Sequence, residues 1–274
     1  MDFAAARLML VGCGKMGTAL LCGWIAGGAN PANVIVVEPS KDAMAAFADD
    51  RCAPFVERPE NVPDTFHPDV IILAVKPQLM GAVAPAYTRY SNTGVVFLSI
   101  AAGTTIGFLE KALSAAAPII RSMPNTPAAV GRGVTAAICN AYVRQPHRVL
   151  CEQLLRSIGD VVWITDEADI DAVTAVSGSG PAYVFHLVEA MTTAGIAEGL
   201  SPEVASRLAR ATVAGAGELL HQSPESASTL RDNVTSRRGT TAAALEVLMA
   251  DNGLSALVKR AVAAAANRSR ELGV

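Results

Sequence analysis

Short apolar runs recur along the first 165 residues, and they constrain the fold more than any other feature of this chain. Each run has four to six residues, the length of a buried strand, and helical patterns separate several of them. Strands buried on both faces of a sheet are nearly continuous in apolar residues, so the pattern predicts an α/β domain with a mostly parallel sheet. The expected strands are residues 7–12, 34–38, 70–75, 94–99, 118–121, 133–138 and 161–164, and the first two helices are expected at residues 16–27 and 40–50.

The pattern changes after Thr165. No strand-like run follows, and apolar residues recur at helical spacing to the end of the chain. Ser201 and Ser223 each precede a Pro-Glu pair, which is typical of a helix start. We therefore expect two domains, residues 1–165 and residues 166–274, of which the second is all-helical.

The composition is apolar for a chain of this length. Hydrophobic residues make up 51% and charged residues 17% of the chain, and the mean hydropathy is +0.34. Such an excess fills a large core or covers a subunit interface, and the apolar later helices favour an interface. The net charge of −3 is not typical of a nucleic-acid binder, and no apolar run reaches the roughly 18 residues of a membrane span. We expect a homo-oligomer with neither nucleic-acid nor membrane partners.

The cysteines are scattered and odd in number. None forms a C-x-x-C pair or lies near a histidine at metal-ligand spacing, so we expect no metal site. With no signal-peptide pattern at the start, this usage favours reduced thiols and a cytoplasmic location. The cysteines are Cys13, Cys22, Cys52, Cys139 and Cys151.

A glycine fingerprint, GCGKMG at residues 12–17, lies between the first expected strand and the first expected helix. In this context Gly12 makes the tight turn, Gly14 lets a pyrophosphate approach, and Gly17 lets the helix pack on the strand. Lys15 and Met16 complete the loop. The fingerprint predicts a Rossmann-type dinucleotide-binding domain.

Glu38 ends the second expected strand. An acid at this position accepts hydrogen bonds from the adenosine ribose and repels a 2′-phosphate, which favours NADH. Ser40 and Lys41 follow at once, and they offer a hydroxyl and a cation that would instead hold such a phosphate. The choice between NADPH and NADH stays open, with a lean to NADH.

Further turns follow the expected strands. In open α/β sheets the ligand lies beyond the carboxyl ends of the strands, so AVKPQ at residues 74–78 is expected to bring Val75, Lys76 and Pro77 to the cofactor. In RSMPNTP, residues 121–127, two prolines fix the backbone around Asn125. The alternatives are that Lys76 is only a solvated surface charge and that the RSMPNTP turn is only a rigid connection between domains. SGSGP at residues 177–181 interrupts a helical pattern, either as a simple break between two helices or with small residues that permit close approach of another chain or a ligand.

A loop of hydroxyl residues, TSRRGTT at residues 235–241, opens directly into an apolar helical pattern. The first turn of a helix has unpaired N–H groups and a partial positive charge, so the loop is suited to binding an anion. An ordinary N-cap is the alternative. The four histidines, His67, His147, His186 and His221, lie outside these motifs, so the chain shows no obvious acid–base residue. Hydride transfer to a carbon–nitrogen double bond needs little such help.

Five motifs, in this order and spacing, resemble those of pyrroline-5-carboxylate reductases, and the likeness covers nearly the whole chain. They are GCGKMG, AVKPQ, RSMPNTPAAVGRG, SGSGPAYVF and LRDNVTSRRGTTAAAL. The resemblance implies a Rossmann-type amino-terminal domain and a helical carboxy-terminal dimerisation domain. It also implies reduction of L-1-pyrroline-5-carboxylate to L-proline, the last step of proline biosynthesis, with NADPH or NADH.

The resemblance also implies roles for the hydroxyl loop. Ser236 and the amides of Gly239 and Thr240 would bind the substrate carboxylate, and the catalytic Thr241 hydroxyl would hydrogen-bond the ring nitrogen. In the family this loop comes from the partner subunit, and the dimers often assemble into decamers. Asn125 and the turn at residues 76–77 would lie near the nicotinamide and its ribose.

One departure from the family pattern falls in this loop. The family usually has a small residue, most often Gly, where this chain has Arg238, and often Pro or Lys in place of Arg237. An arginine there would be strained if the loop needs positive φ. It would also place a cation near the substrate carboxylate or the cofactor phosphates.

Two other functions fit parts of the pattern. A reductase of a related cyclic imine or of a 3-hydroxy acid is one, and the hydroxy acid would use Lys76 as acid and base. A non-catalytic dinucleotide sensor, whose helical domain binds a partner, is the other. The retained Ser236, Gly239, Thr240 and Thr241 favour the imine reductase.

Overall fold

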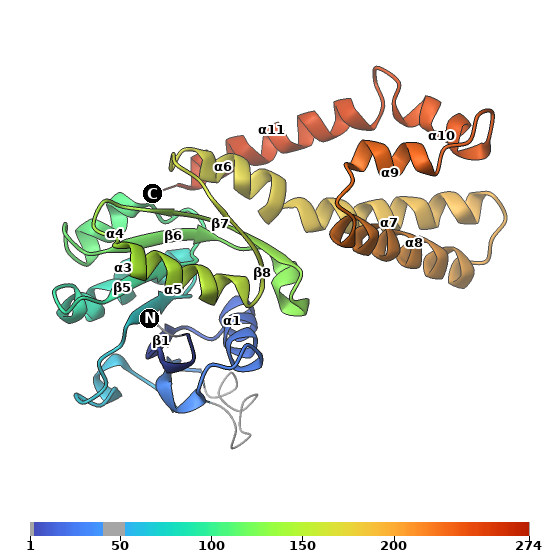
Figure 1. Cartoon of the computed structure of the whole chain (residues 1–274). Coiled ribbons are helices and arrows are strands. Elements are labelled where there is room, and N and C mark those ends of the chain that lie inside the picture. The colour runs from blue at the N-terminus through green and yellow to red at the C-terminus, as the bar shows by residue number, and fades with distance from the viewer. Residues whose placement is uncertain (1–2, 41–52, 274) are drawn as a thin grey trace. The chain divides into compact units, whose positions relative to one another are not determined.

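The computed structural model of the chain describes residues 3–40 and 53–273 (Figure 1). The chain packs as two compact units, Met1–Gly178 with Ala266–Val274, and Ser179–Ala265. The domain boundary that we expect near residue 165 stays a prediction. The helix expected at residues 40–50 lies almost wholly outside the described residues.

The first unit is built on one eight-stranded sheet, in the order β3-β2-β1-β4-β5-β6-β7-β8. All its neighbouring strands are parallel except β6 and β7, so the prediction of a mostly parallel sheet is confirmed. All seven expected runs form strands, and the short edge strand β3 was not expected from the sequence. The strands are β1 (Leu8–Val11), β2 (Val34–Val37), β3 (Phe55–Val56), β4 (Val70–Leu73), β5 (Val96–Ser99), β6 (Ile119–Met123), β7 (Gly133–Cys139) and β8 (Gly159–Trp163).

The reversal between β6 and β7 has a local cause. A parallel crossover needs about a dozen residues or more, usually including a helix. Only a short connection with a 3₁₀ turn at Thr126–Val130 joins these strands, so β7 returns antiparallel beside β6. The sequence pattern did not reveal this reversal.

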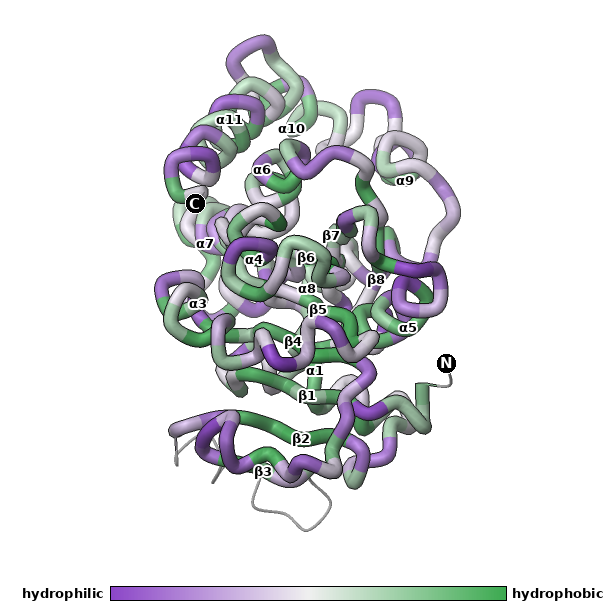
Figure 2. The backbone as a smooth tube through the Cα atoms, turned by 90° about the vertical axis from the view of Figure 1, so that its left-hand side faces the viewer, coloured by the Kyte–Doolittle hydropathy of each residue, from purple (hydrophilic) through white to green (hydrophobic). Residues whose placement is uncertain are grey.

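Both faces of the sheet are covered, which is why its strands read as continuous apolar runs. Along β1, Leu8 and Leu10 belong to one buried cluster, whereas Met9 and Val11 belong to the other. The strands β1, β2, β4 and β5 are buried at every residue, and Figure 2 shows β1, β2 and β4 as green layers of the sheet. On one face the indole N–H of Trp24 donates to the Leu154 carbonyl at 3.0 Å. The helices of the first unit include α1 (Lys15–Ala26), α3 (Pro77–Val83), α4 (Ile106–Ala112), α5 (Gln145–Arg156) and α6 (Asp169–Val173), the last followed by a π turn at Thr174–Gly178; the 3₁₀ turns are Phe3–Ala5, Pro31–Asn33, Pro59–Asn61, Ala84–Tyr90 and Thr126–Val130.

The second unit is all-helical. The predicted start at Ser201 is confirmed, because its side chain accepts a hydrogen bond from the Val204 amide. The start expected at Ser223 is wrong: Ser223 ends the preceding helix, and Ser226 caps the next one by accepting from the Thr229 amide at 3.1 Å. The helices are α7 (Gly180–Ala197), α8 (Pro202–Gln222), α9 (Ala227–Asn233), α10 (Thr240–Leu248) and the first part of α11 (Leu254–Leu272).

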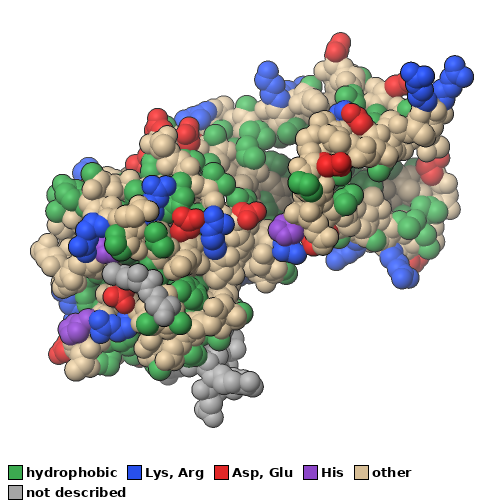
Figure 3. All heavy atoms as spheres, viewed as in Figure 1, with side chains coloured by type: hydrophobic (Ala, Val, Ile, Leu, Met, Phe, Trp, Pro, Cys, Tyr) green, Lys and Arg blue, Asp and Glu red, His purple; other side chains and the backbone are tan. Residues whose placement is uncertain are grey.

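This helical unit buries very little within one chain. Among residues 179–265, all of which the structure describes, only Ala205 and Ala209 are buried. Large apolar side chains are exposed on α7, α8, α10 and α11, and Figure 3 shows apolar side chains on the visible face of these helices. A surface of this kind marks a protein–protein interface. Examples are Phe185, Met191, Leu208, Leu219, Val247 and Leu257. No helix among the described residues is both long and apolar enough to cross a membrane.

Candidate active site

The glycine fingerprint lies where the carboxyl ends of β1, β2 and β4 meet. The Gly12 amide donates to the Val37 carbonyl at 2.9 Å, which ties the loop to the end of β2. Gly12 has a φ of +90°, and a Cβ atom on it would lie 2.9 Å from the Ala74 carbonyl oxygen and 3.0 Å from Val75 Cγ1. The loop after β1 and the turn after β4 are therefore in contact. The strand order reverses direction between β1 and β4, the position at which open α/β sheets bind ligands.

The other two glycines of the fingerprint have different surroundings. A Cβ atom on Gly17 would collide with the Gly12 carbonyl oxygen, so Gly17 lets the first turn of α1 pack against the loop. A Cβ atom on Gly14 would meet nothing of this chain within 4 Å. Gly14 precedes α1, and no side chain caps that helix. The open space beside an uncapped helix start fits a dinucleotide pyrophosphate.

Glu38 is held by backbone amides. Its Oε2 atom accepts from the Cys13 amide at 2.7 Å, and its Oε1 atom accepts from the Ser40 amide at 2.9 Å. The acid is half-buried and Ser40 is exposed. Lys41, which the sequence offers as a phosphate ligand, lies outside the described residues. The carboxylate is thus fixed against the glycine fingerprint.

The turn after β4 leads into α3. Val75 is half-buried against Gly12, Lys76 is exposed just before α3, and Pro77 is the first residue of that helix. The structure therefore brings this turn to the same sheet edge as Gly12 and Glu38, as the sequence predicts.

The side chain of Asn125 hydrogen-bonds to two segments that are distant from each other in the sequence. Its Nδ2 atom donates to the Ser177 carbonyl at 3.1 Å, and its Oδ1 atom accepts from the Val134 amide at 2.9 Å. Its side chain thus joins the RSMPNTP and SGSGP motifs. At the second motif a Cβ atom on Gly178 would lie 2.8 Å from Met123 Cε of the same chain, and the approach of another chain or a ligand there stays a prediction. The contact of Asn125 with the nicotinamide stays a prediction.

The sequence did not predict an ion pair of the same motif, which joins Arg121 to Glu167. The Arg121 Nη1 atom lies 2.5 Å from Glu167 Oε1, and the Arg121 side chain is only 7% exposed. The same carboxylate oxygen accepts from the Ile106 amide at 2.8 Å. The arginine of RSMPNTP therefore anchors the chain just before α6. No periodicity or motif could have revealed its partner 46 residues away.

The hydroxyl loop of residues 235–241 precedes α10 in the second unit. The helix has Gly239 at its N-cap and no side-chain cap. Thr235 donates its hydroxyl to the Arg231 carbonyl at 2.7 Å. Among the described residues, no partner is found for the hydroxyls of Ser236, Thr240 and Thr241. These hydroxyls and the uncapped helix start form a group of unused donors.

Two protein families match the chain. Residues 167–272 match the family described as pyrroline-5-carboxylate reductase dimerisation. Residues 7–103 match the family described as NADP oxidoreductase, coenzyme F420-dependent.

Individual relatives match over the full length. The pyrroline-5-carboxylate reductase of Pseudomonas aeruginosa is 41% identical over 266 residues, which cover 97% of this chain and 96% of that protein. The chain belongs to the pyrroline-5-carboxylate reductase family. A solved structure of such a reductase from Coxiella burnetii is 34% identical, with a TM-score of 0.92 over 98% of this chain and 99% of that one. The Plasmodium falciparum reductase with NADP bound is 31% identical, with a TM-score of 0.81 over the whole of both chains.

These relatives confirm the predictions of family, fold and activity. The chain is an NAD(P)H-dependent oxidoreductase that acts on a carbon–nitrogen double bond, reducing L-1-pyrroline-5-carboxylate to L-proline. Its sheet and helices are those of the Rossmann-type and dimerisation domains expected for the family. The match to a dimerisation domain also supports a homo-oligomer, in agreement with the exposed apolar helices.

The departure at Arg238 has the expected structural consequence in this reductase. Arg238 has a φ of +58°, and it is the one non-glycine residue with positive φ among the described residues. The left-handed region costs an L-residue roughly 1–2 kcal/mol, and glycine avoids that cost. The structure therefore has the positive φ at which an arginine is expected to be strained.

We expect Arg238→Gly to stabilise the protein. Relief of the strain, offset in part by the greater freedom of glycine in the unfolded chain, should raise the free energy of unfolding by about 0.5–1 kcal/mol. Thermal unfolding of the two proteins measures the difference. Arg237→Gly is the matched control, because Arg237 has no positive φ and the change should lower stability. A lower midpoint for Arg238→Gly than for wild type would contradict the strain argument.

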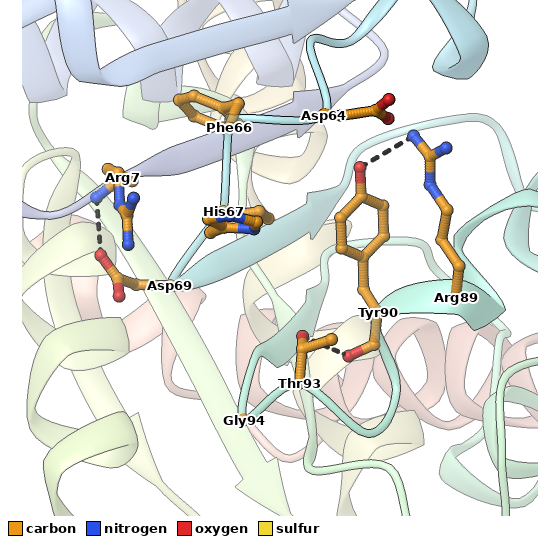
Figure 4. Close-up of a pocket in the computed structure, with 10 residues that line it drawn as sticks. Arg7, Asp64, Phe66, His67, Asp69, Arg89, Tyr90, Thr93 and Gly94 are labelled. Atoms are coloured by element: carbon orange, nitrogen blue, oxygen red, sulfur yellow. Dashed lines mark hydrogen bonds between the residues drawn. The ribbon is translucent and has the colours of Figure 1, made fainter.

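A pocket on the first unit lies apart from these motifs (Figure 4). It is lined by residues just before β1, β4 and β5, at the amino ends of those strands, and none of the predicted site residues lines it. Arg7 donates its amide to Asp69 at 2.8 Å, and Arg89 donates to the Tyr90 hydroxyl at 2.9 Å. The coenzyme motifs occupy the opposite edge of the sheet.

Proposed function

We propose that the hydroxyl loop holds L-1-pyrroline-5-carboxylate and that the glycine fingerprint holds NAD(P)H. The observation that carries this proposal is the start of α10, an uncapped helix end with three hydroxyls that have no partner among the described residues. A helix end of this kind favours a carboxylate, because its amides donate hydrogen bonds and its dipole is positive there.

Each group of the loop has a role in this proposal. The Ser236 hydroxyl and the amides of Gly239 and Thr240 bind the substrate carboxylate, which fixes the ring. The Gly239 amide also donates to the Ser236 carbonyl at 3.1 Å, so the carboxylate would share this donor with the loop. The Thr241 hydroxyl then lies at the ring nitrogen and is the catalytic group. Binding at two points orients the imine carbon, and orientation supplies much of the rate.

The coenzyme side uses residues of the first unit. The amides of Lys15 and Met16 and the open space at Gly14 receive the pyrophosphate, because they form the start of α1. Gly12 and Gly17 shape this loop. The remaining predicted contacts are Glu38, Ser40 and Lys41 at the ribose and Val75, Lys76, Pro77 and Asn125 towards the nicotinamide.

The chemistry needs few protein groups. NAD(P)H supplies a hydride to the imine carbon, and the nitrogen takes up a proton. Because an imine nitrogen is basic enough to carry its own proton, the residues of the loop need only orient and polarise the substrate. This agrees with the absence of a histidine from every motif of the chain.

The assembly is part of the same proposal. We expect a homodimer in which the hydroxyl loop of one subunit faces the coenzyme of its partner, and dimers that associate into decamers. The exposed apolar side chains of the helical unit support the dimer. A cytoplasmic location follows from the cysteine usage.

The initial rate of NADH and NADPH oxidation with L-1-pyrroline-5-carboxylate tests the proposal. We expect oxidation that depends on the imine, with proline formed in equal amount. A 3-hydroxy acid with the oxidised coenzyme serves as control, and we expect no reduction of the coenzyme in that assay. Turnover of the hydroxy acid that disappears in Lys76→Ala, with none of the imine, would overturn the proposal.

A further inference from the structure

The carboxylate of Glu38 is fixed at the coenzyme loop by both of its oxygens. The Cys13 amide donates to Oε2 and the Ser40 amide donates to Oε1, at 2.7 and 2.9 Å. Cys13 lies between Gly12 and Gly14, so one bond joins the acid to the glycine fingerprint itself. The backbone of Glu38 is also held, because its amide donates to the Val56 carbonyl of β3 at 3.0 Å. The charge therefore cannot swing away without loss of these bonds.

This position is the one that reads the adenosine ribose. In Rossmann-type domains an acid at the end of the second strand accepts hydrogen bonds from the ribose hydroxyls. A carboxylate offers about four lone-pair sites, of which the two amides use two. Glu38 thus keeps the capacity to accept from both hydroxyls of the ribose.

A 2′-phosphate meets an unfavourable environment at the same place. It carries a charge of roughly −1.5 to −2 and would lie beside the fixed carboxylate. No arginine or lysine of the described part of the chain forms an ion pair with Glu38. The Ser40 amide, a donor that a phosphate would use, already donates to Glu38.

We infer that Glu38 makes this chain select NADH over NADPH. The inference rests on the proposed coenzyme site and adds the residue that sets its specificity. The Plasmodium falciparum relative has NADP bound in its structure, so both coenzymes are compared in the tests.

Binding measurements on the wild-type protein give the first test. The dissociation constants of NADH and NADPH are measured from the fluorescence of the reduced nicotinamide. AMP and adenosine 2′,5′-bisphosphate are compared by competition, because these probes differ only in the 2′-phosphate. We expect NADH and AMP to bind at least about tenfold more tightly than their phosphorylated counterparts, a ratio that salt reduces by screening. Tighter binding of NADPH or of the bisphosphate would overturn the inference.

Glu38→Gln identifies the residue responsible. We expect the NADH preference to fall about tenfold, through weaker NADH binding and stronger NADPH binding, since the repulsion is lost and one acceptor remains. Glu38→Asp keeps the charge and should retain the preference for NADH. Asp64→Asn removes the same charge in the pocket at the opposite edge of the sheet (Figure 4), and its preference should equal that of wild type.

The outcomes separate this inference from the proposed function. If thermal unfolding shows that Glu38→Gln is folded and its coenzyme preference is unchanged, Glu38 is not the residue that selects NADH. Selection between the AMP probes without turnover of any imine would support the role of Glu38 and contradict the proposed reaction.

Discussion

Gly14→Val should abolish coenzyme binding and leave the fold intact. A Cβ atom at Gly14 meets nothing of this chain within 4 Å, so the valine side chain has room in the free protein. That room is the space beside the start of α1 that we assign to the pyrophosphate. The side chain would displace the phosphates from the helix amides, and we expect the affinity for NADH to fall at least about 100-fold. Fluorescence titration with NADH measures the loss.

Gly17→Val is the matched control, because there the same substitution should lower the stability of the fold rather than block the coenzyme directly. A Cβ atom there would collide with the Gly12 carbonyl oxygen, and backbone cannot move aside cheaply. We expect this variant to lose several kcal/mol of stability, as overpacked sites do. Gly14→Val should instead unfold within about 0.5 kcal/mol of the wild-type free energy, the range of ordinary surface changes. Normal NADH affinity in a folded Gly14→Val protein would move the coenzyme away from this loop.

The sequence predicted the strands well for a physical reason. Because the sheet is covered on both faces, β1, β2 and β4 are apolar throughout and β5 is apolar except for its last residue, and such runs stand out in the sequence. The glycine fingerprint could be placed for the same reason, since its context is a strand followed by a helix. The edge strand β3 has only two residues and half-buried side chains, so it carries no such pattern.

Contacts between distant segments could not be predicted in this way. Nothing in the sequence pairs Arg121 with Glu167, or directs both ends of the Asn125 amide to Ser177 and Val134. These bonds depend on which turns the fold brings together, and polar side chains in turns show no periodicity. The resemblance to a family predicts that Asn125 contacts the coenzyme. The structure shows a different role, in which its side chain joins the segments that carry Ser177 and Val134.

The helical unit shows a third limit. Its exposed apolar residues recur at helical spacing, so the sequence predicts helices. The same spacing occurs whether the apolar face of a helix packs within its own chain or against another subunit. Only the burial of individual side chains distinguishes these two kinds of packing, and in this unit nearly all side chains are exposed or half-buried. The prediction of an interface therefore rested on composition, and the structure gives it a location.

The hydroxyl loop is the site at which the largest effect on turnover is expected. Thr241→Val should lower kcat about 10- to 100-fold, because a hydrogen bond to a charged group contributes roughly 1.5–3 kcal/mol. Valine has nearly the shape of threonine and lacks only the hydroxyl. As hydride reaches the protonated imine, the electrons of the double bond become a lone pair on nitrogen, and the Thr241 hydroxyl donates a hydrogen bond to that lone pair as it develops. Steady-state kinetics should show a lower kcat with little change in KM, since the carboxylate contacts remain.

Thr235→Val is the control within the same loop. Its hydroxyl is already donated to the Arg231 carbonyl at 2.7 Å, so its loss should cost about 1 kcal/mol of stability and leave kcat near the wild-type value. Thr241→Ser should restore most of the lost turnover, because it returns a hydroxyl to the same position. A Thr241→Val enzyme as fast as wild type would show that the ring nitrogen finds its partner elsewhere. The carboxylate contacts at Ser236 and Gly239 would then account for the loop by binding alone.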